Sequence, residues 1–343
     1  MTLATATQDG DVRVERTAEA ARLRALADPA PGRVLYALSA LGVADQLATS
    51  PRTTGWLADA VRADEDALRR VLRVAADLRV VRQEDDTWHL LLAGELLRAD
   101  VPGSLRAEFA DNDLFQLWTG FLDSVRTGAP CYPTVFGTSL FERLAATPDA
   151  MRAFHQHMDD RARLMYAPLL DLPVWPTTGV LVDVAGGTGG LLRQLLESRP
   201  SLCGVLHDLP EVLALSPLPD SADLAERLRF AAADMFVSPL PAGDVYLLAS
   251  VLHDWPDEAA ATILRRCRTA GRLLVVDRVV PSPDSGADAS AAYRNDLLML
   301  AAVGGRERTR PEWTALLDGA GFWLVAVHGA EGTELSVLEC TPV

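Results

Sequence analysis

A glycine-rich turn between an apolar segment and a helix-like segment most constrains what this chain can fold into. The apolar run Leu181–Val184 includes Asp183, four glycines occupy positions 186–190, and the helix-like segment 191–196 follows. A buried strand that turns through glycines into a helix brings backbone N–H groups and a helix N-terminus close to a ligand. The turn therefore predicts a site for a nucleotide-type cofactor.

Two types of cofactor are compatible with this turn. The dinucleotide fingerprint needs a third glycine three residues after the second, which requires Ala185 to replace the first glycine. The alternative register, Asp183-x-Ala185-x-Gly187-x-Gly189, resembles motif I of class I S-adenosylmethionine (SAM) methyltransferases with the same alanine. The methyl group of Ala185 is compatible with the turn if its φ is negative. A nicotinamide dehydrogenase remains an alternative at this point.

Composition excludes several classes of protein. The 343 residues carry a formal net charge of −15, whereas nucleic-acid-binding proteins normally present a basic surface. No apolar run approaches the length of a transmembrane helix, and residues 1–15 show no signal-peptide pattern. The scattered cysteines have no metal-ligand spacing, so we expect buried, reduced thiols, no metal and a cytoplasmic location. These cysteines are Cys131, Cys203, Cys267 and Cys340.

The first third of the chain predicts a small helical domain. Residues 1–17 are polar and predicted to be disordered, and 18–105 form the predicted domain. Its apolar spacing predicts three helices and then a short hairpin, over 33–47, 54–61, 65–78 and 80–90. This order is winged-helix-like and leaves a DNA-binding regulator as an alternative. The acidic start of the third helix, at Asp64, favours a dimerisation scaffold instead.

The remainder predicts a helical segment over 106–175 and an α/β domain over 176–343. From residue 180 onward strand-like and helix-like runs alternate, which predicts a doubly wound, Rossmann-like parallel sheet covered by helices on both faces. A capping box with a proline predicts a helix start at Thr309. The strand-like runs are 180–184, 202–207, 229–233, 245–249, 273–276, 323–327 and 335–338. Ligands of such sheets bind at the carboxyl ends of the strands.

Two acidic residues at predicted strand ends are candidates for cofactor binding. Asp208 closes the second strand, where a carboxylate would accept hydrogen bonds from ribose hydroxyls. Asp234 ends the third strand, where it could accept from an adenine amino group while Met235 and Phe236 cover the ring. The structural alternatives are a helix N-cap for Asp208 and a loop cap for Asp234.

A histidine at the end of the fourth strand is a candidate general base. His253 has an unperturbed pKa of ~6.5 and can take a proton near neutrality. Asp277 ends the next strand, and neighbouring parallel strands would place it beside His253. Glu307 supplies a second carboxylate from a glycine loop. Either carboxylate could orient the imidazole and stabilise its charged form.

Taken together, these motifs resemble the caffeate-type family of small-molecule O-methyltransferases, which includes bacterial polyketide-tailoring enzymes. The resemblance rests on the glycine loop, Asp208-Leu209-Pro210, Asp234-Met235-Phe236, Leu252-His253-Asp254-Trp255, Asp277 and Gly304-Gly305-Arg306-Glu307-Arg308-Thr309. It implies the class I methyltransferase fold, SAM as methyl donor with S-adenosylhomocysteine as product, and a homodimer. It also implies His253 as the base, with Asp277 standing where plant members have a glutamate and Glu307 as second carboxylate.

The same resemblance completes the predicted site. The segment Phe154-x-x-x-Met158 matches one that lines the acceptor pocket of the family, and we expect Met299 to face the same space. The predicted acceptor-binding residues are Trp118, Phe154, Met158, Asp254 and Met299. The predicted cofactor-binding residues are Asp183, Gly186, Gly187, Gly189, Asp208, Leu209, Asp234, Met235, Phe236 and Ser250.

The predicted reaction is methylation of a phenolic hydroxyl on a natural-product intermediate, of the orsellinate type or a larger polycyclic phenol. A phenol of pKa ~10 facing a histidine of ~6.5 leaves a gap of roughly 3.5 units, or about 5 kcal/mol. Orientation alone can contribute about 7–11 kcal/mol, so the gap is surmountable. A relative that binds SAM but catalyses hydroxylation or decarboxylation is the main alternative, because some members of the family have lost the histidine.

Overall fold

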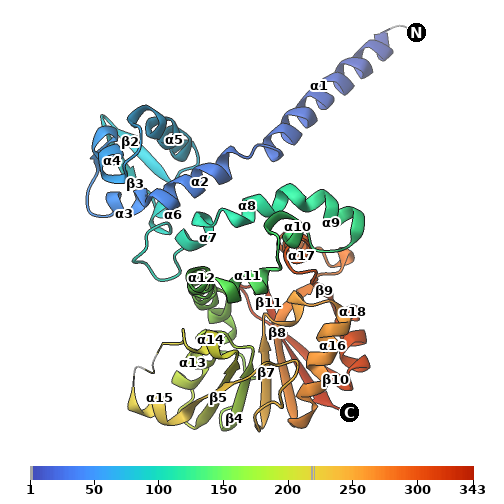
Figure 1. Ribbon diagram of the computed structural model, residues 1–343. Helices are drawn as coiled ribbons and strands as arrows, with labels where there is room; N and C mark the ends of the chain where they lie inside the picture. Colours follow the sequence, from blue (N-terminus) through green and yellow to red (C-terminus); the bar gives the residue numbers. More distant parts are fainter. Residues whose placement is uncertain (1–2, 218, 220) are drawn as a thin grey trace. The chain divides into compact units, whose positions relative to one another are not determined.

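The chain forms two compact units, Met1–Asn112 and Asp113–Val343 (Figure 1). This computed structural model describes the backbone of residues 3–217, 219 and 221–343, and side chains from Glu15 onward. The predicted segment 106–175 is divided between the two units at Asn112. The assignment of the first domain to dimerisation stays a prediction.

The first unit combines helices with a small antiparallel sheet in the order β1-β3-β2. Its core packs apolar residues of α2 to α5 around Trp88, whose indole N–H donates to Thr54 Oγ1 at 2.9 Å. Its elements are α1 (Leu3–Leu26), α2 (Ala30–Leu41), α3 (Val43–Leu47), β1 (Arg52–Thr53), α4 (Thr54–Val61), α5 (Glu65–Asp77), β2 (Val81–Glu84), β3 (Thr87–Leu90), α6 (Leu92–Glu95) and α7 (Arg106–Ala110).

Two features of this unit differ from the prediction. The helix expected over 33–47 is interrupted at Gly42, whose φ of +68° ends α2 and starts α3. Residues 3–17, expected to be disordered, belong to helix α1, and residues 1–2 lie outside the described residues. The second half of α1 is rich in alanine, arginine and leucine, which have high helix propensity without needing tertiary contacts. Composition polar enough to suggest disorder is therefore also compatible with an exposed helix.

The second unit is built on an eight-stranded sheet in the order β10-β11-β8-β7-β4-β5-β6, with β9 pairing with β8 outside this path. β4 pairs in parallel with β5 on one side and with β7 on the other, so the chain reverses direction across the sheet beside β4. The strands are β4 (Gly179–Val184), β5 (Leu202–Asp208), β6 (Leu228–Ala232), β7 (Val245–Ala249), β8 (Arg272–Val280), β9 (Arg308–Thr309), β10 (Phe322–Gly329) and β11 (Leu335–Pro342).

The sheet is mixed rather than fully parallel. β11 runs antiparallel to both β8 and β10, as expected when two strands are joined by a short turn instead of a crossover helix. The five-residue connection between β10 and β11 is too short for a crossover helix. The carboxyl ends of β4, β5, β7 and β8 still meet at one edge, and the glycine loop starts there.

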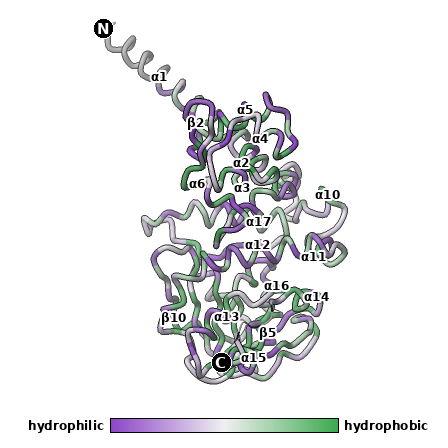
Figure 2. The backbone as a smooth tube through the Cα atoms, turned by 90° about the vertical axis from the view of Figure 1, so that its left-hand side faces the viewer, coloured by the Kyte–Doolittle hydropathy of each residue, from purple (hydrophilic) through white to green (hydrophobic). Residues whose placement is uncertain are grey.

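Alternating residues of the central strands enter two separate cores, one on each face of the sheet. Val182, Tyr246 and Val275 pack with residues of α16 and α18. Leu181, Leu247 and Leu274 pack with α13 and with the end of α12. Figure 2 shows hydrophobic backbone around α13 and β5, whereas much of α12 is coloured hydrophilic. The continuous apolar strand runs in the sequence follow from this two-sided burial.

The helices of this unit include the predicted start at Thr309. Its hydroxyl accepts from the backbone N–H of Glu312, whose carboxylate in turn accepts from Thr309, so the capping box is confirmed. The helices are α8 (Asp113–Leu117), α9 (Phe121–Thr127), α10 (Tyr132–Phe136), α11 (Leu140–Ala146), α12 (Pro148–Tyr166), α13 (Gly190–Glu197), α14 (Pro210–Leu213), α15 (Ala222–Arg227), α16 (Asp257–Arg266), α17 (Ser290–Ala302) and α18 (Arg310–Gly319). The short 3-10 turns are Trp118–Gly120, Ala167–Leu169, Leu252–Asp254, Cys267–Thr269 and Pro283–Ser285.

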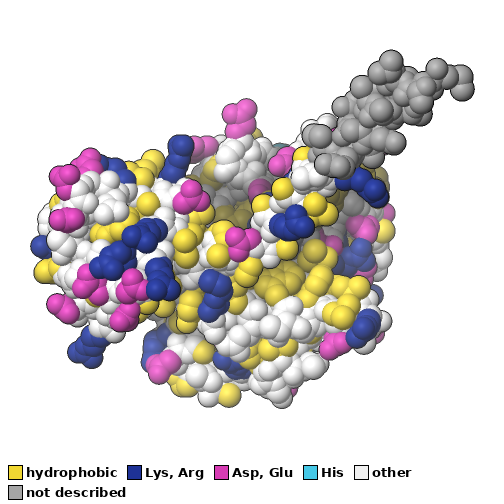
Figure 3. Space-filling view, turned by 90° about the horizontal axis from the view of Figure 1, so that it is seen from above, with side chains coloured by type: hydrophobic (Ala, Val, Ile, Leu, Met, Phe, Trp, Pro, Cys, Tyr) yellow, Lys and Arg dark blue, Asp and Glu magenta, His cyan; other side chains and the backbone are white. Residues whose placement is uncertain are grey.

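Surface and cysteine positions complete the description. Basic and acidic side chains are interspersed with apolar ones over the face drawn in Figure 3. All four cysteines are unpaired, and Cys203 on β5 is exposed, which corrects the expectation that every thiol is buried. Its neighbours in the strand, Leu202 and Gly204, are buried, because successive residues of a strand face opposite sides of the sheet. None of the described helices is both long and apolar enough to cross a membrane.

Candidate functional site

The glycine loop packs so closely that larger residues would not fit. A Cβ at Gly186 would lie 2.5 Å from Cγ of Asp183 and 2.6 Å from Cδ1 of Leu206. Gly187 and Gly189 have φ of +62° and +89°, which favour glycine. Ala185 has a φ of +55°, so the condition under which its methyl group was expected to be tolerated is not met. The left-handed conformation costs an alanine roughly 1–2 kcal/mol and is maintained by the surrounding packing.

Asp183 lies at the centre of the site without a full set of partners. It is 1% exposed, and its Oδ1 has no hydrogen-bond donor among the described residues. Burial, followed by the negative charge of Asp208, raises the pKa of Asp183 to about 8. A buried carboxyl group that lacks a donor is a place where a ligand donor or a cation is favourable.

Asp208 links the end of β5 to the glycine loop. Its Oδ2 accepts from the backbone N–H of Gly187 at 2.8 Å, and its Oδ1 accepts from Leu209 at 2.7 Å. Burial raises the pKa of Asp208 to about 6, so the carboxylate is mostly ionised at neutral pH. The residue preceding α14 is Leu209, and Asp208 does not cap that helix. Each carboxylate oxygen keeps a further lone pair for a ligand.

Asp234 caps its own turn, as in the structural alternative considered for it. Its Oδ1 accepts from the backbone N–H of Phe236 at 2.7 Å. Met235 and Phe236 are partly buried against the sheet core. The Phe236 ring packs edge to face on Trp255, with the ring centroids 4.7 Å apart. The cap holds these two side chains in a fixed turn beside the carboxyl end of β6, and it does not preclude a ligand at the second oxygen.

Helix α12 lies against the glycine loop, an arrangement that the sequence did not predict. The hydroxyl of Thr188 donates to Asp159, and a Cβ at Gly190 would lie 3.5 Å from Cβ of Ala162. Tyr166 donates to Oγ of Ser250 at 2.8 Å. Ser250 follows β7 directly and has a φ of +53°. The face of α12 that carries Asp159, Ala162 and Tyr166 therefore closes over the loop and the strand ends.

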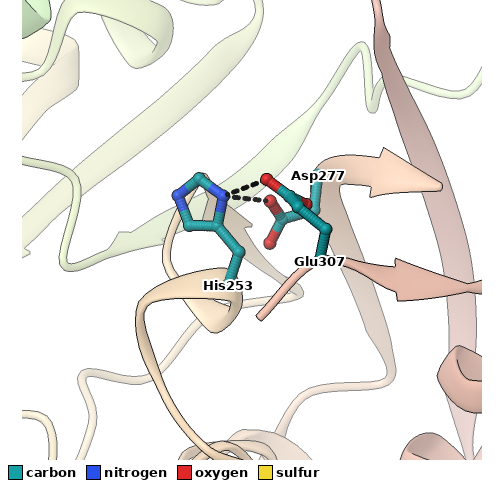
Figure 4. A group of neighbouring side chains, drawn as sticks. All are labelled: His253, Asp277 and Glu307. Carbon is teal, nitrogen blue, oxygen red and sulfur yellow. Dashed lines mark hydrogen bonds and ion pairs between the residues drawn. The ribbon is translucent and has the colours of Figure 1, made fainter. Parts of the chain in front are cut away.

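The predicted histidine and its two carboxylates come together at the ends of β7 and β8. Nδ1 of His253 lies 3.1 Å from Oε1 of Glu307 and 3.3 Å from Oδ1 of Asp277. Figure 4 shows both carboxylates approaching this one nitrogen, with the other ring nitrogen pointing away from them. Nε2 is 3.6 Å from Oδ1 of Asp254, beyond hydrogen-bond distance. The side chain of Asp277 is one methylene shorter than the glutamate of plant family members, and its carboxylate nevertheless reaches the imidazole ring.

The charges around His253 determine its protonation. Burial disfavours the imidazolium, but the charges of Asp277 and Asp254 and the hydrogen bond to Glu307 outweigh it and raise the pKa of His253 to about 9. Burial raises the pKa of Asp277 to about 6 even though the His253 charge opposes this. The pKa of Glu307 is lowered, since hydrogen bonds and positive charge offset its burial. At neutral pH the cluster holds an imidazolium between carboxylates.

Three residues that the sequence analysis did not identify hold Glu307 in place. Its Oε1 also accepts from Asn295 Nδ2 at 2.5 Å and from Arg278 Nη1 at 3.3 Å, and its backbone N–H donates to Asp296 Oδ1 at 2.8 Å. These contacts join β8, α17 and the glycine loop before β9. No local sequence motif indicates them, because the partners are brought together only by tertiary folding.

The segment that carries His253 is fixed from the glycine loop as well. Arg308 is fully buried and donates to the carbonyl oxygens of Leu252 at 2.9 Å and Trp255 at 2.8 Å. A Cβ at Gly305 would overlap the backbone of His253 and Asp254. The loop therefore positions both the backbone of His253 and the Glu307 carboxylate that contacts its ring.

The distances within this cluster are also compatible with a metal ion, which the sequence analysis did not expect. One ligand atom from each of His253, Asp277 and Glu307 lies within 4.8 Å of the others. The same Glu307 oxygen already accepts from Arg278 and Asn295, and a cation there would compete with the guanidinium. The hydrogen-bond pattern favours an oriented histidine over a metal ligand.

The residues predicted to bind an acceptor are distributed over four elements of the second unit, including the 3-10 turn Leu252–Asp254 that carries Asp254. Phe154 and Met158 are partly buried on α12, Met299 is partly buried on α17, and Trp118 is 39% exposed in the turn after α8. A cavity of about 280 Å³ nearby is lined by other residues, including Phe141, Trp255 and Val303. Trp255, two residues after His253, stacks on Phe141 with the ring centroids 5.5 Å apart. This cavity is therefore lined by a residue two positions after His253, and Trp255 and Phe141 were missing from the predicted set.

Comparisons with known proteins give a consistent result. Residues 118–323 match the model of a family described as an O-methyltransferase domain. The chain is 35% identical to O-demethylpuromycin-O-methyltransferase of Streptomyces alboniger, over 90% of this chain and 85% of that protein. It is 36% identical to 2,7-dihydroxy-5-methyl-1-naphthoate 7-O-methyltransferase of Streptomyces carzinostaticus, over 93% and 97%.

One relative is named for a different activity, and a solved O-methyltransferase structure has the same fold as this chain. Aclacinomycin 10-hydroxylase RdmB of Streptomyces purpurascens is 35% identical over 90% of this chain and 87% of that protein. The O-methyltransferase NcsB1 from neocarzinostatin biosynthesis, solved with S-adenosylmethionine and 2-hydroxy-5-methyl naphthoic acid, superimposes with a TM-score of 0.80. It is 32% identical, over 94% of this chain and 98% of that chain.

Proposed function

The chain belongs to the family of SAM-dependent O-methyltransferases, and we propose that it methylates a phenolic hydroxyl of an aromatic natural-product intermediate with His253 as general base. One observation carries the proposal. Two buried carboxylates hold Nδ1 of His253, which leaves Nε2 as the ring nitrogen that can accept a proton from an acceptor. Asp277 and Glu307 act through the imidazole and are positioning residues.

The raised basicity of His253 matches a phenol. With the pKa of His253 at about 9, a phenol of pKa ~10 loses its proton to the ring at a cost of about 1.4 kcal/mol, compared with about 5 for an unperturbed histidine. Since the ring is mostly protonated at neutral pH, an acceptor that arrives ionised forms the same imidazolium–phenolate pair. The base is therefore adapted to phenols, whereas an aliphatic alcohol would leave a much larger gap.

The residues around the glycine loop fit the methyl donor. Bound S-adenosylmethionine supplies an electrophilic methyl group and departs as S-adenosylhomocysteine. Asp208 retains lone pairs for ribose hydroxyls, and the unpartnered Oδ1 of Asp183 favours a cationic or donor group. A Cβ at Gly186 would meet Asp183 and Leu206, so the backbone there leaves no room for a larger residue. We assign Asp183, Gly187, Asp208 and Ser250 to this binding site.

Relatives narrow the class of acceptor. The names of two of them specify a dihydroxynaphthoate and an amino-hydroxybenzoate as substrates. For this chain we infer an aromatic, polyketide-type acceptor with a phenolic hydroxyl, which includes orsellinate-like acids. The apolar space beside Trp255 suits a flat aromatic ring.

Methyl transfer from isotope-labelled SAM to a panel of phenolic acids and polycyclic phenols tests the proposal. We expect mass spectrometry to find one labelled methyl group on oxygen in at least one product. The His253→Ala variant of the same preparation should lose this product. Transfer to nitrogen or carbon alone, or full activity of the variant, would contradict the assignment of the reaction or of the base.

A second function is favoured by the match to a hydroxylase. The 35% identity to aclacinomycin 10-hydroxylase RdmB equals the identity to O-demethylpuromycin-O-methyltransferase. The labelled assay separates the two, because a hydroxylated or decarboxylated product without label would indicate SAM-bound, non-methylating chemistry. The buried base favours methyl transfer, since it provides a proton acceptor for a phenol.

We also propose that the protein is a homodimer, as the family resemblance implies. Helix α9 exposes Leu122 (57%) and Val125 (60%), which a second copy would cover. Light scattering after size-exclusion chromatography measures the mass directly. A stable species of one chain's mass, 36.9 kDa, would contradict the proposal.

A further inference from the structure

Helix α12 carries a second row of residues beside the one that contacts the glycine loop. Asp159, Ala162 and Tyr166, which contact the loop and Ser250, follow the three- and four-residue spacing of one helix face. Phe154, Met158, Arg161 and Met165 have the same spacing, rotated by one position. This second row lies about 100° around the helix from the first, so it flanks the face that closes over the glycine loop.

The second row is mainly apolar, and Arg161 is its one charged member. Phe154 packs against a cluster that includes Met151, and Met165 packs against the sheet core. Arg161 is itself partly buried. A partly buried guanidinium that donates to a thioether sulfur is better satisfied when an anion binds to it.

Arg161 has no carboxylate partner on its own helix. The residues three and four positions away are His157, Met158, Leu164 and Met165. In the described part of the chain its Nη2 donates to the Met165 sulfur at 3.6 Å, a weak acceptor, and it forms no ion pair. Arginines on other helices, such as Arg227 with Asp223, pair with a carboxylate one turn away.

The charge of Arg161 acts on the residue next to the base. Burial raises the pKa of Asp254, and the charge of Arg161 acts in the opposite direction. Burial likewise raises the pKa of Tyr166, and the charge of Arg161 lowers it. Arg161 is thus within electrostatic reach of both the Asp254 side of His253 and the Tyr166–Ser250 contact.

We propose that Arg161 binds a carboxylate of the aromatic acceptor and so selects hydroxylated aromatic acids over neutral phenols. The inference rests on the proposed methyl transfer and adds the charge of the acceptor to it. A planar guanidinium fork matches a carboxylate and fixes the orientation of the ring that carries it. A dianionic phosphate would leave one negative charge uncompensated near Asp254 and Glu307.

A pair of acceptors that differ only in charge tests this. We compare kcat/KM for a hydroxynaphthoic acid and its methyl ester with the wild type, Arg161→Gln and Arg161→Lys. Loss of a charged hydrogen bond predicts that R161Q lowers kcat/KM for the acid by about 10- to 150-fold. The loss for the ester should be much smaller, and R161K, which keeps the charge without the fork, should fall between.

Arg163 provides the matched control. It lies on the same helix, is exposed, and is nine residues from Phe154, which places it on the opposite side. R163Q should leave the acid-to-ester ratio of the wild type unchanged. Equal losses for acid and ester in R161Q, or no loss for the acid, would overturn the inference.

A binding measurement separates this inference from the proposed function. Calorimetry follows the binding of naphthoic acid, which has no hydroxyl to methylate, to enzyme loaded with S-adenosylhomocysteine. Binding that R161Q weakens, combined with no methyl transfer to any phenol, would reject the proposed function and support the carboxylate site. Methyl transfer with an acid-to-ester ratio unaffected by R161Q would support the function and reject the site.

Discussion

Two clusters of buried carboxylates at the same edge of the sheet differ in whether the protein supplies their positive charge. At the ends of β4 and β5, Asp208 accepts from backbone N–H groups, Oδ1 of Asp183 has no donor among the described residues, and burial raises the pKa of both. At the ends of β7 and β8, Asp277 and Glu307 contact His253, and Arg278 adds a guanidinium. Among the described residues the first cluster is paired with no cationic side chain, whereas the second is paired with a histidine and an arginine, although both oxygens of Asp277 and Oε2 of Glu307 accept no hydrogen bond there.

This difference bears on the proposed division between cofactor binding and proton transfer. Carboxylates without a partner in the protein favour a cationic ligand, because the ligand removes the cost of their burial. Carboxylates that are already paired with a histidine change its basicity instead. Under the proposed function, the first cluster therefore binds the cofactor and the second sets the basicity of His253.

The largest expected effect is on catalysis through the second cluster. His253→Ala removes the proposed base, and we expect kcat to fall by about 10²–10⁴-fold with cofactor affinity retained. Methyl-transfer kinetics and calorimetry with S-adenosylhomocysteine measure the two quantities. His328→Ala is the control, because His328 also contacts a carboxylate, Glu339 at 3.0 Å, but on β10. Equal loss of cofactor binding in H253A would break the separation of the two clusters.

The corresponding change at the first cluster should act on binding. Gly186→Ala places a methyl group against the Asp183 carboxyl and Leu206, which costs about 1–3 kcal/mol. We expect cofactor affinity to fall by up to about 100-fold, measured by calorimetry. A Cβ at Gly319 meets nothing within 4 Å, so Gly319→Ala serves as the control. Unchanged affinity in G186A would show that the loop is not the cofactor site.

The pH dependence sharpens the description of the base. Because a proton acceptor must be neutral and the pKa of His253 is about 9, kcat/KM of cofactor-saturated enzyme should rise with pH and level off above about 9. Glu307→Gln removes one carboxylate, so the midpoint should move down by about one pH unit. Two acceptors of different acidity distinguish the enzyme pKa from the acceptor pKa. Glu258→Gln, at an exposed site, should keep the wild-type profile.

A last expected effect concerns the pH dependence of stability at the first cluster. The pKa of Asp183 is raised to about 8 from an unfolded value of about 3.9, so its contribution is fully present below pH 3.9 and lost as pH rises through about 8. This gives a slope of at most about 1.4 kcal/mol per pH unit. Asp183→Asn should flatten the decline of Tm between pH 5 and 8 in ligand-free protein. A slope equal to that of the wild type would mean that Asp183 is ionised when buried.

Much of this site was predictable because it follows the order of the strands. Asp208, Asp234, His253 and Asp277 each end an apolar run, and parallel strands bring such ends to one edge. Glu307 was indicated by the family motif around it. Asn295 and Arg278 had no such signal, because their role depends on contacts between α17, β8 and a loop. Trp255 and Phe141 form a stack that no spacing in the sequence indicates.

As with the site, the strands of the fold were predictable from the sequence, whereas the direction of one strand and one backbone conformation were not. Apolar runs buried on both faces identified the strands, but the antiparallel direction of β11 depends on a short connection whose pairing the periodicity does not report. The φ of Ala185 was also beyond the sequence, because alanine favours the opposite sign and only the packing around Asp183 and Leu206 sets the turn.

The sequence by itself determined the family and the glycine turn and pointed to His253 as the candidate base, because these depend on residue type and local order along the chain. Only the tertiary structure decided which charges face one another. Charge interactions fall off with distance and depend on burial, and neither quantity is encoded in spacing. For that reason the raised pKa of His253, and the position of Arg161 without an ion pair among the described residues, emerge only when α12, α17 and the sheet edge are assembled.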